Sequence, residues 1–337
     1  MSKSNENTSI YQNIGVIGAG AWGTALAVAA AQAGRTVTLW AREAELVAQM
    51  RHSAENGMYL PGVKIPSGIA ATGDIAVAAN ADALLLVVPA QHLRASLADV
   101  TRHVAKGTPL VLCAKGIEKT TGELLSEILA EAAPDCERAI LSGPSFAKDV
   151  ARNMPTAVTI AARMDVALKL QAALGHATFR PYASDDIVGV ALGGAAKNVY
   201  AIASGIVDGM GLGESARAAL IARSFAELTR LGTALGAKPE TLMGLSGLGD
   251  LVLTATSKSS RNFSFGHALG RGRTLKELDA PGHALAEGVE TAPAIVKRAR
   301  KERIELPIAE AVAHVLDGSL PLGDAVLRLM SRPLKPE

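Results

Sequence analysis

The stretch that decides the fold is NIGVIGAGAWGTALAVAAAQAG, residues 13–34. Its first part, Asn13–Ile17, is rich in β-formers and predicts a strand, and the alanine-rich residues 24–33 predict a helix. The loop between them has GxGxxG spacing, with glycines at Gly18, Gly20 and Gly23. After a strand and before a helix, such glycines permit a tight turn, the close approach of a pyrophosphate and the packing of helix on strand. We therefore predict a dinucleotide site at the helix N-terminus. The alternative is a turn that only joins strand to helix.

The second predicted strand, Thr36–Trp40, indicates which dinucleotide is bound. A fold that prefers NAD places a carboxylate after this strand for the ribose 2′-hydroxyl, but this chain has Arg42, which suits a 2′-phosphate. We predict that NADPH/NADP is preferred and that NADH/NAD is also accepted. Glu43 and Glu45 argue the other way, although they also favour the start of a following helix. Arg42 could instead be a solvated surface cation.

Strands and helices continue to alternate. Residues 83–88 and 110–114 are wholly apolar, as parallel strands covered on both faces are, and helical patterns follow them at residues 91–105 and 122–133. Two more strand-like runs, residues 157–161 and 178–182, close the sheet, after which every pattern is helical. We predict an α/β chain, with an N-terminal Rossmann-like doubly wound sheet over residues 13–186 and an all-α domain over residues 187–333.

Ligands of a doubly wound sheet bind beyond the carboxyl ends of its strands. Three features fall there: residues 89–91, the Lys115-Gly116 pair, and GPSFA at residues 143–147. Lys115 is therefore placed to meet a ligand. The alternative is an ordinary exposed loop lysine.

The second informative stretch is VGVALGGAAKNVYAIASGIVDGM, residues 188–210, where Lys197 and Asn198 interrupt a long apolar run. A run of this length can span a membrane, but its five glycines and central polar pair favour a helix inside a protein. A buried ammonium is costly unless it is paired. We predict that Lys197 carries the chemistry, against the alternative of a helix-edge lysine whose head reaches water.

A third stretch, residues 243–265, follows with MGLSGLGDLVLTATSKSSRNFSF. Asp250 comes after a glycine-rich loop, so it could be a helix cap as well as a functional carboxylate. Ser260, Arg261 and Asn262 cluster hydrogen-bond donors that suit a phosphate. The alternative for this cluster is a polar loop with a capping serine.

Composition excludes several classes of function. The 337 residues carry 34 basic and 32 acidic side chains, a net charge of +2, which gives no bulk attraction to nucleic acid or to an anionic membrane. The N-terminal residues 1–13 are polar and lack the apolar core of a signal peptide, so we expect a soluble cytoplasmic protein. Cys113 and Cys136 form neither a disulfide framework nor a metal-ligand spacing, and no metal is expected.

Seven separated motifs follow one another along the chain in this order: GAGAWG, Lys115-Gly116, GPSFA, GGAAKN, GLGDLVLTATS, SSRN and AEGVET. In this the chain resembles the bacterial NAD(P)-dependent glycerol-3-phosphate dehydrogenases, from Asn13 to about Pro333. The resemblance implies reversible reduction of dihydroxyacetone phosphate to sn-glycerol 3-phosphate for glycerophospholipid synthesis. A homodimer is expected from the resemblance alone.

The resemblance also implies residue roles. Lys197 matches the catalytic lysine, a general acid/base, and the same site has Asp250, Lys115 and Thr254. The implied substrate contacts are Lys115, Gly143, Ser145, Lys197, Asp250, Ser260, Arg261 and Asn262. The implied cofactor contacts are Gly18, Gly20, Ala21, Trp22, Gly23, Arg42, Lys115, Ala147, Arg261, Leu285 and Glu287. Two positions depart from the family pattern: Ala21, where many members have serine, and Ala255, where many have cysteine.

Two other functions stay open. A dehydrogenase for another small hydroxy acid would share the nucleotide domain and the lysine but should lack a phosphate pocket such as Ser260-Arg261-Asn262. A nucleotide-sensing protein without catalysis is a different class, and Lys197 together with Asp250 argues against it.

Overall fold

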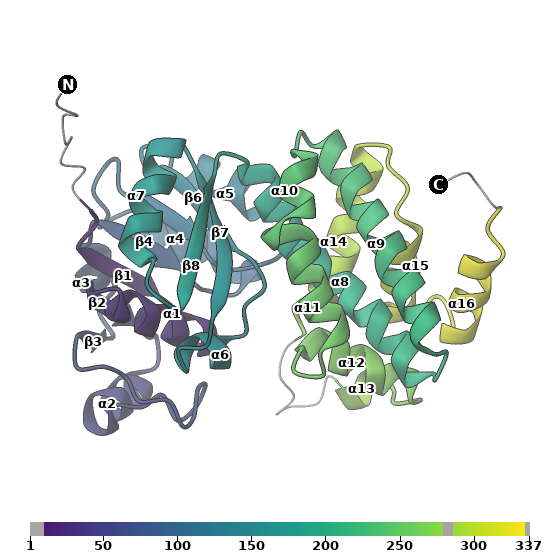
Figure 1. Ribbon diagram of the computed structural model, residues 1–337, viewed down its shortest axis with the longest axis horizontal. Coiled ribbons are helices and arrows are strands. Elements are labelled where there is room, and N and C mark those ends of the chain that lie inside the picture. Colours follow the sequence, from purple (N-terminus) through teal and green to yellow (C-terminus); the bar gives the residue numbers. More distant parts are fainter. Residues whose placement is uncertain (1–9, 279–285, 334–337) are drawn as a thin grey trace. The chain divides into compact units, whose positions relative to one another are not determined.

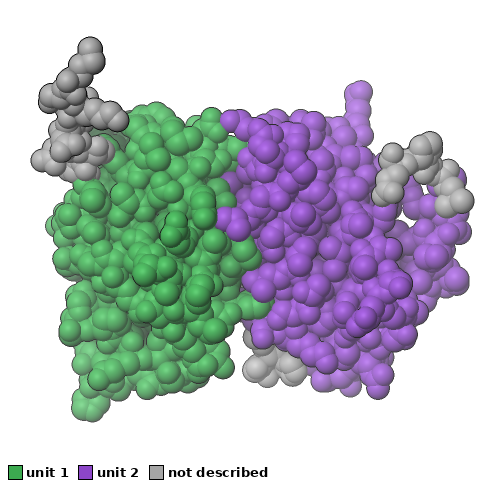
Figure 2. Space-filling model, in the orientation of Figure 1, with its two compact units in different colours: residues 1–114, 126–187 green, residues 115–125, 188–337 purple. Residues whose placement is uncertain are grey.

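The computed structural model describes residues 10–278 and 286–333, and the chain divides into two compact units. Unit 1 comprises Met1–Ala114 and Ser126–Ile187, and unit 2 comprises Lys115–Leu125 and Val188–Glu337. Figure 2 shows the two units in green and purple. The segment Lys115–Leu125 therefore packs with the second unit, although both of its chain neighbours belong to the first.

Unit 1 is built on an eight-stranded sheet in the order β3-β2-β1-β4-β5-β6-β7-β8 (Figure 1). All neighbouring strands are parallel except β6 and β7. The first six follow the order of dinucleotide-binding sheets, which confirms the predicted fold class. The strands are β1 (Asn13–Ile17), β2 (Thr36–Trp40), β3 (Ile69–Thr72), β4 (Ala83–Leu86), β5 (Pro109–Leu112), β6 (Glu137–Ser142), β7 (Thr156–Ala162) and β8 (Phe179–Ser184).

Helices cover the sheet because its central strands are apolar on both faces. Every residue of β4 and β5 is buried. On one face α1, α6 and α7 pack together over Val16, Leu85 and Val111. The helices of this part of the chain are α1 (Ala21–Gln32), α2 (Ala44–Ser53), α3 (Ile75–Ala79), α4 (Leu93–Val100), α5 (Leu125–Ala132), α6 (Ala147–Ala151) and α7 (Met164–Leu174).

One local prediction needs correction, and one strand was missed. The helix predicted over residues 91–105 is only Leu93–Val100, preceded by a 3-10 turn, because the residues after Val100 supply no further buried apolar side chain before Thr108. The short strand β3 was not predicted, since its sequence IAAT has neither a clear alternation nor a long apolar run.

Unit 2 is helical in its described part, apart from an isolated bridge between Ile117 and Leu124. Its helices are α8 (Ile187–Gly209), α9 (Glu214–Ala234), α10 (Pro239–Met243), α11 (Asp250–Thr256), α12 (Arg261–Gly270), α13 (Leu275–Leu278), α14 (Glu287–Lys301), α15 (Pro307–Leu316) and α16 (Leu322–Met330). A π-helical turn, Leu245–Gly249, leads into α11.

The central helix α8 is long and apolar enough to cross a membrane by composition, yet 89% of its most apolar window is buried inside the protein. It is a core helix. Part of its glycine content is explained by α12, because a Cβ atom at Gly205 or Gly209 would lie 2.1 or 2.2 Å from a backbone oxygen of that helix. The two helices therefore pack backbone against backbone.

One buried carboxyl ties three helices of unit 2 together. Glu227 of α9 accepts hydrogen bonds from the backbone N–H groups of Ile308 and Ala309, at 2.7 and 3.3 Å, in the first turn of α15. It also accepts one from the hydroxyl of Tyr200 on α8, at 3.3 Å. Burial raises the pKa of Glu227 to about 7.

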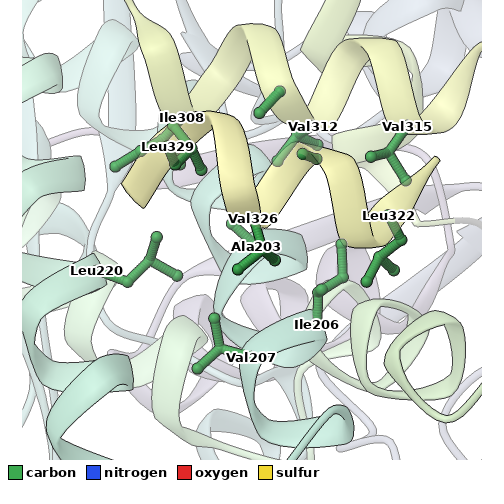
Figure 3. Close-up of a pocket in the computed structure, with 12 residues that line it drawn as sticks. Ala203, Ile206, Val207, Leu220, Ile308, Val312, Val315, Leu322, Val326 and Leu329 are labelled. Atoms are coloured by element: carbon green, nitrogen blue, oxygen red, sulfur yellow. The ribbon is translucent and has the colours of Figure 1, made fainter. Parts of the chain in front are cut away.

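A cavity of about 50 Å³ lies among α8, α9, α15 and α16 (Figure 3). Its lining residues on α8 are C-terminal to Lys197. Its lining is aliphatic, with side chains such as Ile206, Leu220, Val312 and Val326. The polar groups described below do not line it, so it is a packing feature of the helical unit.

Candidate functional site

The glycine-rich loop after β1 has the geometry of a dinucleotide-binding turn. Gly18 has a φ of +113°, which disfavours any side chain there. A Cβ at Gly23 would lie 1.8 Å from the carbonyl oxygen of Gly18, so helix and loop approach too closely for alanine. A Cβ at Gly20 would have no atom within 4 Å. Neighbouring protein atoms therefore do not require glycine at Gly20, but the close approach of a pyrophosphate would.

The first residues of α1 also fit a cofactor. Gly20 is the N-cap and provides no side-chain cap, so N–H groups of the first turn are available to an anion. Ala21 and Trp22 follow, and the indole N–H of Trp22 is buried with no hydrogen-bond partner among the described residues. The missing hydroxyl at Ala21 leaves these backbone groups in place.

Arg42 lies just beyond β2, where the sequence predicted a side chain that contacts the 2′-phosphate of the cofactor ribose. Its side chain is 79% exposed and pairs with Glu43 at 3.0 Å. An exposed pair of this kind contributes about 0–1 kcal/mol, so it would not hold the guanidinium away from a ligand phosphate. Glu43 is the N-cap residue of α2 and Glu45 lies in its first turn, as expected for acidic residues at a helix start.

The loop after β6 carries three predicted contacts in unit 1. Gly143 has a φ of +152°, and a Cβ there would lie 2.8 Å from the Cα of Val158 on β7. The hydroxyl of Ser145 donates to the carbonyl oxygen of Gly143 at 3.0 Å, and Ala147 begins α6. These residues lie at the carboxyl end of β6, where the sequence placed them.

In unit 2 the segment Lys115–Leu125 forms a strap that packs against α14. Lys119 pairs with Glu290 at 2.8 Å, and the ammonium of Lys297 donates to the backbone oxygen of Thr120 at 2.6 Å. The strap brings Lys115 into the helical unit, where its side chain is only 12% exposed. The reading of Lys115 as an ordinary exposed loop lysine is therefore wrong.

Two lysines share one buried carboxylate, and we call this group the Lys-Asp-Lys cluster. Lys197 Nζ lies 2.6 Å from Asp250 Oδ1, and Lys115 Nζ lies 2.6 Å from Asp250 Oδ2. Asp250 is fully buried at the start of α11 and makes no helix-cap bond. Thr254, one turn further on, accepts a hydrogen bond from Lys197 Nζ at 2.8 Å. Lys197 is thus paired with a carboxylate and its side chain is only 9% exposed, unlike a helix-edge lysine whose head is solvated.

The cluster gives Lys197 an unusual acidity. Burial lowers the pKa of Lys197 to about 8, the charge of Asp250 raises it, and the nearby charge of Lys115 lowers it. The ammonium is therefore the main form at neutral pH, yet it releases its proton far more readily than an exposed lysine.

The predicted phosphate cluster lies at the N-terminus of α12. Ser260 is the N-cap, and its hydroxyl accepts from the N–H of Phe263 at 3.2 Å, so the capping role is real. Arg261 follows in the first turn and is exposed. Asn262 is buried and donates to Asn198 Oδ1 at 2.9 Å, which places it beside the residue after Lys197.

Asn198 and Asn262 extend this network to α14. Asn198 donates to Glu287 Oε2 at 3.3 Å, and the N–H of Gly288 donates to Asn262 Oδ1 at 2.9 Å. The sequence placed Asn198 near the catalytic group but could not indicate partners 64 and 89 residues away. Leu285, a predicted cofactor contact, lies outside the described residues. No group of three or more His, Cys, Asp or Glu among the described residues could hold a metal ion.

A doubly wound sheet with an open glycine loop, and a buried ammonium–carboxylate cluster in the same chain, define an oxidoreductase that uses a nicotinamide dinucleotide. The sequence identifies the family. Residues 13–167 match the NAD-dependent glycerol-3-phosphate dehydrogenase N-terminus, and residues 186–327 match the C-terminus of the same enzymes. The chain belongs to the NAD(P)-dependent glycerol-3-phosphate dehydrogenase family.

Similar proteins agree over nearly the whole chain. The NAD(P)+ glycerol-3-phosphate dehydrogenase of Parvibaculum lavamentivorans is 57% identical over 98% of this chain and 99% of its own length. The enzyme of the same name from Caulobacter vibrioides is 53% identical over 97% of this chain and 99% of its own length. The crystal structure of glycerol-3-phosphate dehydrogenase from Coxiella burnetii superposes with a TM-score of 0.91 at 38% identity, covering 96% of this chain and 99% of that one.

Proposed function

We propose that this enzyme reversibly reduces dihydroxyacetone phosphate to sn-glycerol 3-phosphate, with NADPH preferred over NADH, and that Lys197 is the general acid/base. The observation that carries the proposal is the buried Lys197 ammonium, 2.6 Å from a fully buried Asp250 and hydrogen-bonded to Thr254. Burying an ammonium is costly even beside a paired carboxylate, so its position in the core favours a functional role.

The chemistry needs a proton and a positive charge at one place. A bound nicotinamide supplies the hydride that adds to the carbonyl carbon of the substrate. Negative charge then develops on the carbonyl oxygen, and Lys197 stabilises that charge and transfers a proton from Nζ to the oxygen. In the reverse direction neutral Lys197 takes the proton from the hydroxyl. Its pKa of about 8 suits both directions near neutral pH.

The other members of the cluster position Lys197 and set its charge. Asp250 fixes both ammonium groups through its two oxygens, and Thr254 accepts a second bond from Lys197. Lys115 adds a second positive charge, so the cluster carries a net charge of about +1 when both lysines are protonated. Such a site favours an oxyanion over a neutral carbonyl.

The substrate phosphate would bind at the first turn of α12. Ser260, Arg261 and Asn262 bring a hydroxyl, an exposed guanidinium and an amide to a helix N-terminus. The bond between Asn262 and Asn198 ties this turn to the helix that carries Lys197. We assign Gly143 and Ser145 as further substrate contacts.

The cofactor contacts in the proposal are the fingerprint residues with Arg42 for the 2′-phosphate, together with Lys115, Ala147, Arg261, Leu285 and Glu287. In the cell we expect a cytoplasmic homodimer that supplies the glycerol backbone of phospholipids. The homodimer is an expectation from the family alone.

The test is direct. Purified enzyme mixed with NADPH and dihydroxyacetone phosphate should consume NADPH, followed by its near-ultraviolet absorbance, and product should be identified as sn-glycerol 3-phosphate. Lys197→Met keeps most of the stem's packing and should be at least ~100-fold slower while still binding NADPH. Faster turnover of a 2-keto acid than of dihydroxyacetone phosphate would favour a hydroxy-acid dehydrogenase. Binding of NADPH without turnover of either would favour a nucleotide sensor.

A further inference from the structure

A buried asparagine outside every predicted site is hydrogen-bonded to the glycine-rich loop. Asn56 lies after α2, is fully buried, and stands 37 residues from Ala19 and 32 residues from Thr24 along the chain. Its Nδ2 donates to the backbone oxygen of Ala19 at 2.8 Å and to the hydroxyl of Thr24 at 2.8 Å. Ala19 lies between Gly18 and Gly20, and Thr24 directly follows Gly23.

The orientation of the Asn56 amide is fixed by backbone groups on both sides. Its Oδ1 accepts from the N–H of Tyr59 at 3.0 Å, while its Nδ2 faces the carbonyl oxygen of Ala19. A flipped amide would place an oxygen against an oxygen and a nitrogen donor against an N–H. One donor hydrogen therefore serves the fingerprint loop at Ala19 and the other serves α1 at Thr24, while the acceptor serves the loop that contains Asn56.

The loop that contains Asn56, residues 54–65, is closed by other bonds. The N–H of Ile65 donates to the oxygen of Ala54 at 2.7 Å, and the N–H of Gly62 donates to Glu55 Oε1 at 2.7 Å. The N–H of Leu60 donates to the backbone oxygen of Asn56 at 2.9 Å. The two Nδ2 bonds are therefore additional to those that close the loop, and they act on the nucleotide fingerprint.

The bond to Ala19 has a consequence for phosphate binding. The carbonyl of Ala19 and the N–H of Gly20 belong to one rigid peptide plane and point in opposite directions. Fixing the oxygen toward Asn56 therefore fixes the N–H of Gly20 on the other side. Gly20 is also the position where a Cβ would meet open space, as a site for pyrophosphate requires.

We propose that Asn56 is a positioning residue for cofactor binding, which holds the Ala19–Gly20 peptide so that the Gly20 N–H faces the cofactor pyrophosphate. This rests on the cofactor use in the proposed function and adds a residue to it. Asn56 does not touch the cofactor and acts through the backbone of the fingerprint.

The test measures binding without catalysis. Dissociation constants for NADPH, ADP-ribose and adenosine 2′-phosphate are measured by calorimetry, with unfolding temperatures as the check on folding. Asn56→Asp puts a carboxylate oxygen against the carbonyl of Ala19, so it should weaken NADPH and ADP-ribose roughly ten- to a hundred-fold. Adenosine 2′-phosphate has no pyrophosphate, and its affinity should change by less than about two-fold.

Two variants make the result specific. Thr24→Val removes one acceptor of the Asn56 amide, together with the 3.5 Å bond from the Thr24 hydroxyl to the Ala19 oxygen, without burying a charge. It should weaken ADP-ribose by about three- to ten-fold. Glu55→Ala loosens the same 54–65 loop but leaves the Asn56 amide in place, so it should leave ADP-ribose affinity unchanged. If Asn56→Asp does not fold, the comparison of Thr24→Val with Glu55→Ala decides.

Three outcomes would overturn the proposal. In the first, folded variants of Asn56 and Thr24 bind ADP-ribose with the same dissociation constant as the wild type. In the second, adenosine 2′-phosphate loses as much affinity as ADP-ribose, which would mean a general loosening of unit 1. In the third, Glu55→Ala weakens ADP-ribose binding as much as Thr24→Val does. A wild-type enzyme that binds neither NADPH nor ADP-ribose would contradict the proposed function itself.

Discussion

Replacing Asp250 by asparagine should shift the pH profile of the enzyme toward acid. In the wild type, Asp250 faces Lys197 and Lys115 at 2.6 Å each, and no part of it reaches solvent. An amide carries no negative charge, and it presents an oxygen to one of the two ammonium groups and an NH2 donor to the other. The attraction that raises the pKa of Lys197 is lost, while burial and the charge of Lys115 still lower it.

The size and sign of the shift follow from these contacts. An opposite charge at this distance shifts the pKa of its partner by about 1–3 units. This corresponds to roughly 1.4–4 kcal/mol at about 1.4 kcal/mol per unit. The pKa of Lys197 should therefore fall from about 8 by at least about one unit. In the proposed mechanism, reduction of the ketone needs the protonated lysine, so kcat/KM should decline with rising pH near 8 in the wild type and at lower pH in Asp250→Asn. Oxidation needs the neutral lysine, so its rise with pH should shift in the same direction.

The assay is kcat/KM for dihydroxyacetone phosphate across about pH 5 to 10, for both proteins under the same conditions. The substrate phosphate also titrates, with a pKa near ~6, but it does so equally in both experiments and cancels in their ratio. Circular dichroism and NADPH binding establish that the variant is folded. A folded variant whose inflection stays at the wild-type pH would refute the claim that Asp250 sets the acidity of Lys197.

Three further results are expected. Arg42→Ala should raise the KM for NADPH several-fold more than that for NADH, because only NADPH carries the 2′-phosphate; equal factors would mean that Arg42 does not read it. Arg261→Ala should reduce kcat/KM for dihydroxyacetone phosphate by at least ~10-fold, the loss of a charged hydrogen bond, and scarcely change the slow rate with unphosphorylated dihydroxyacetone at saturating cofactor. Glu227→Gln should make the free energy of unfolding less dependent on pH between about 4.5 and 7. In the wild type, protonated Glu227 stabilises the fold at pH values below 4.5, its pKa in the unfolded chain. That stabilisation is lost as the pH rises through about 7, the pKa in the folded protein. Thermal unfolding across this range should show the wild type losing stability relative to the variant.

Much of the fold was predictable because its signals are local. The strand at Asn13–Ile17, the glycine spacing and the apolar runs of β4 and β5 each occupy a few consecutive residues. The antiparallel pairing of β7 with β6 could not be predicted in the same way, because strand direction depends on how the chain returns to the sheet.

The candidate site was predictable where one residue contrasts with its neighbours. Lys197 is such a residue, a single cation within a long apolar helix. Asn56 is the opposite case, since asparagine followed by Gly57 in a polar stretch is typical of a turn. Only its contacts with Ala19 and Thr24 show that it is buried against the fingerprint.

The placement of Lys115 explains why the cluster has two lysines and one carboxylate. A pair of Lys197 with Asp250 alone would be neutral and would offer little net stabilisation to a developing oxyanion. Adding Lys115 leaves about one positive charge and also lowers the pKa of Lys197, which makes it a better acid. That arrangement requires a residue 135 positions from Asp250 to pack with the helical unit. The strap, held on α14 through Lys119 and Lys297, meets this requirement, so under the proposed mechanism its contacts support catalysis as well as the fold.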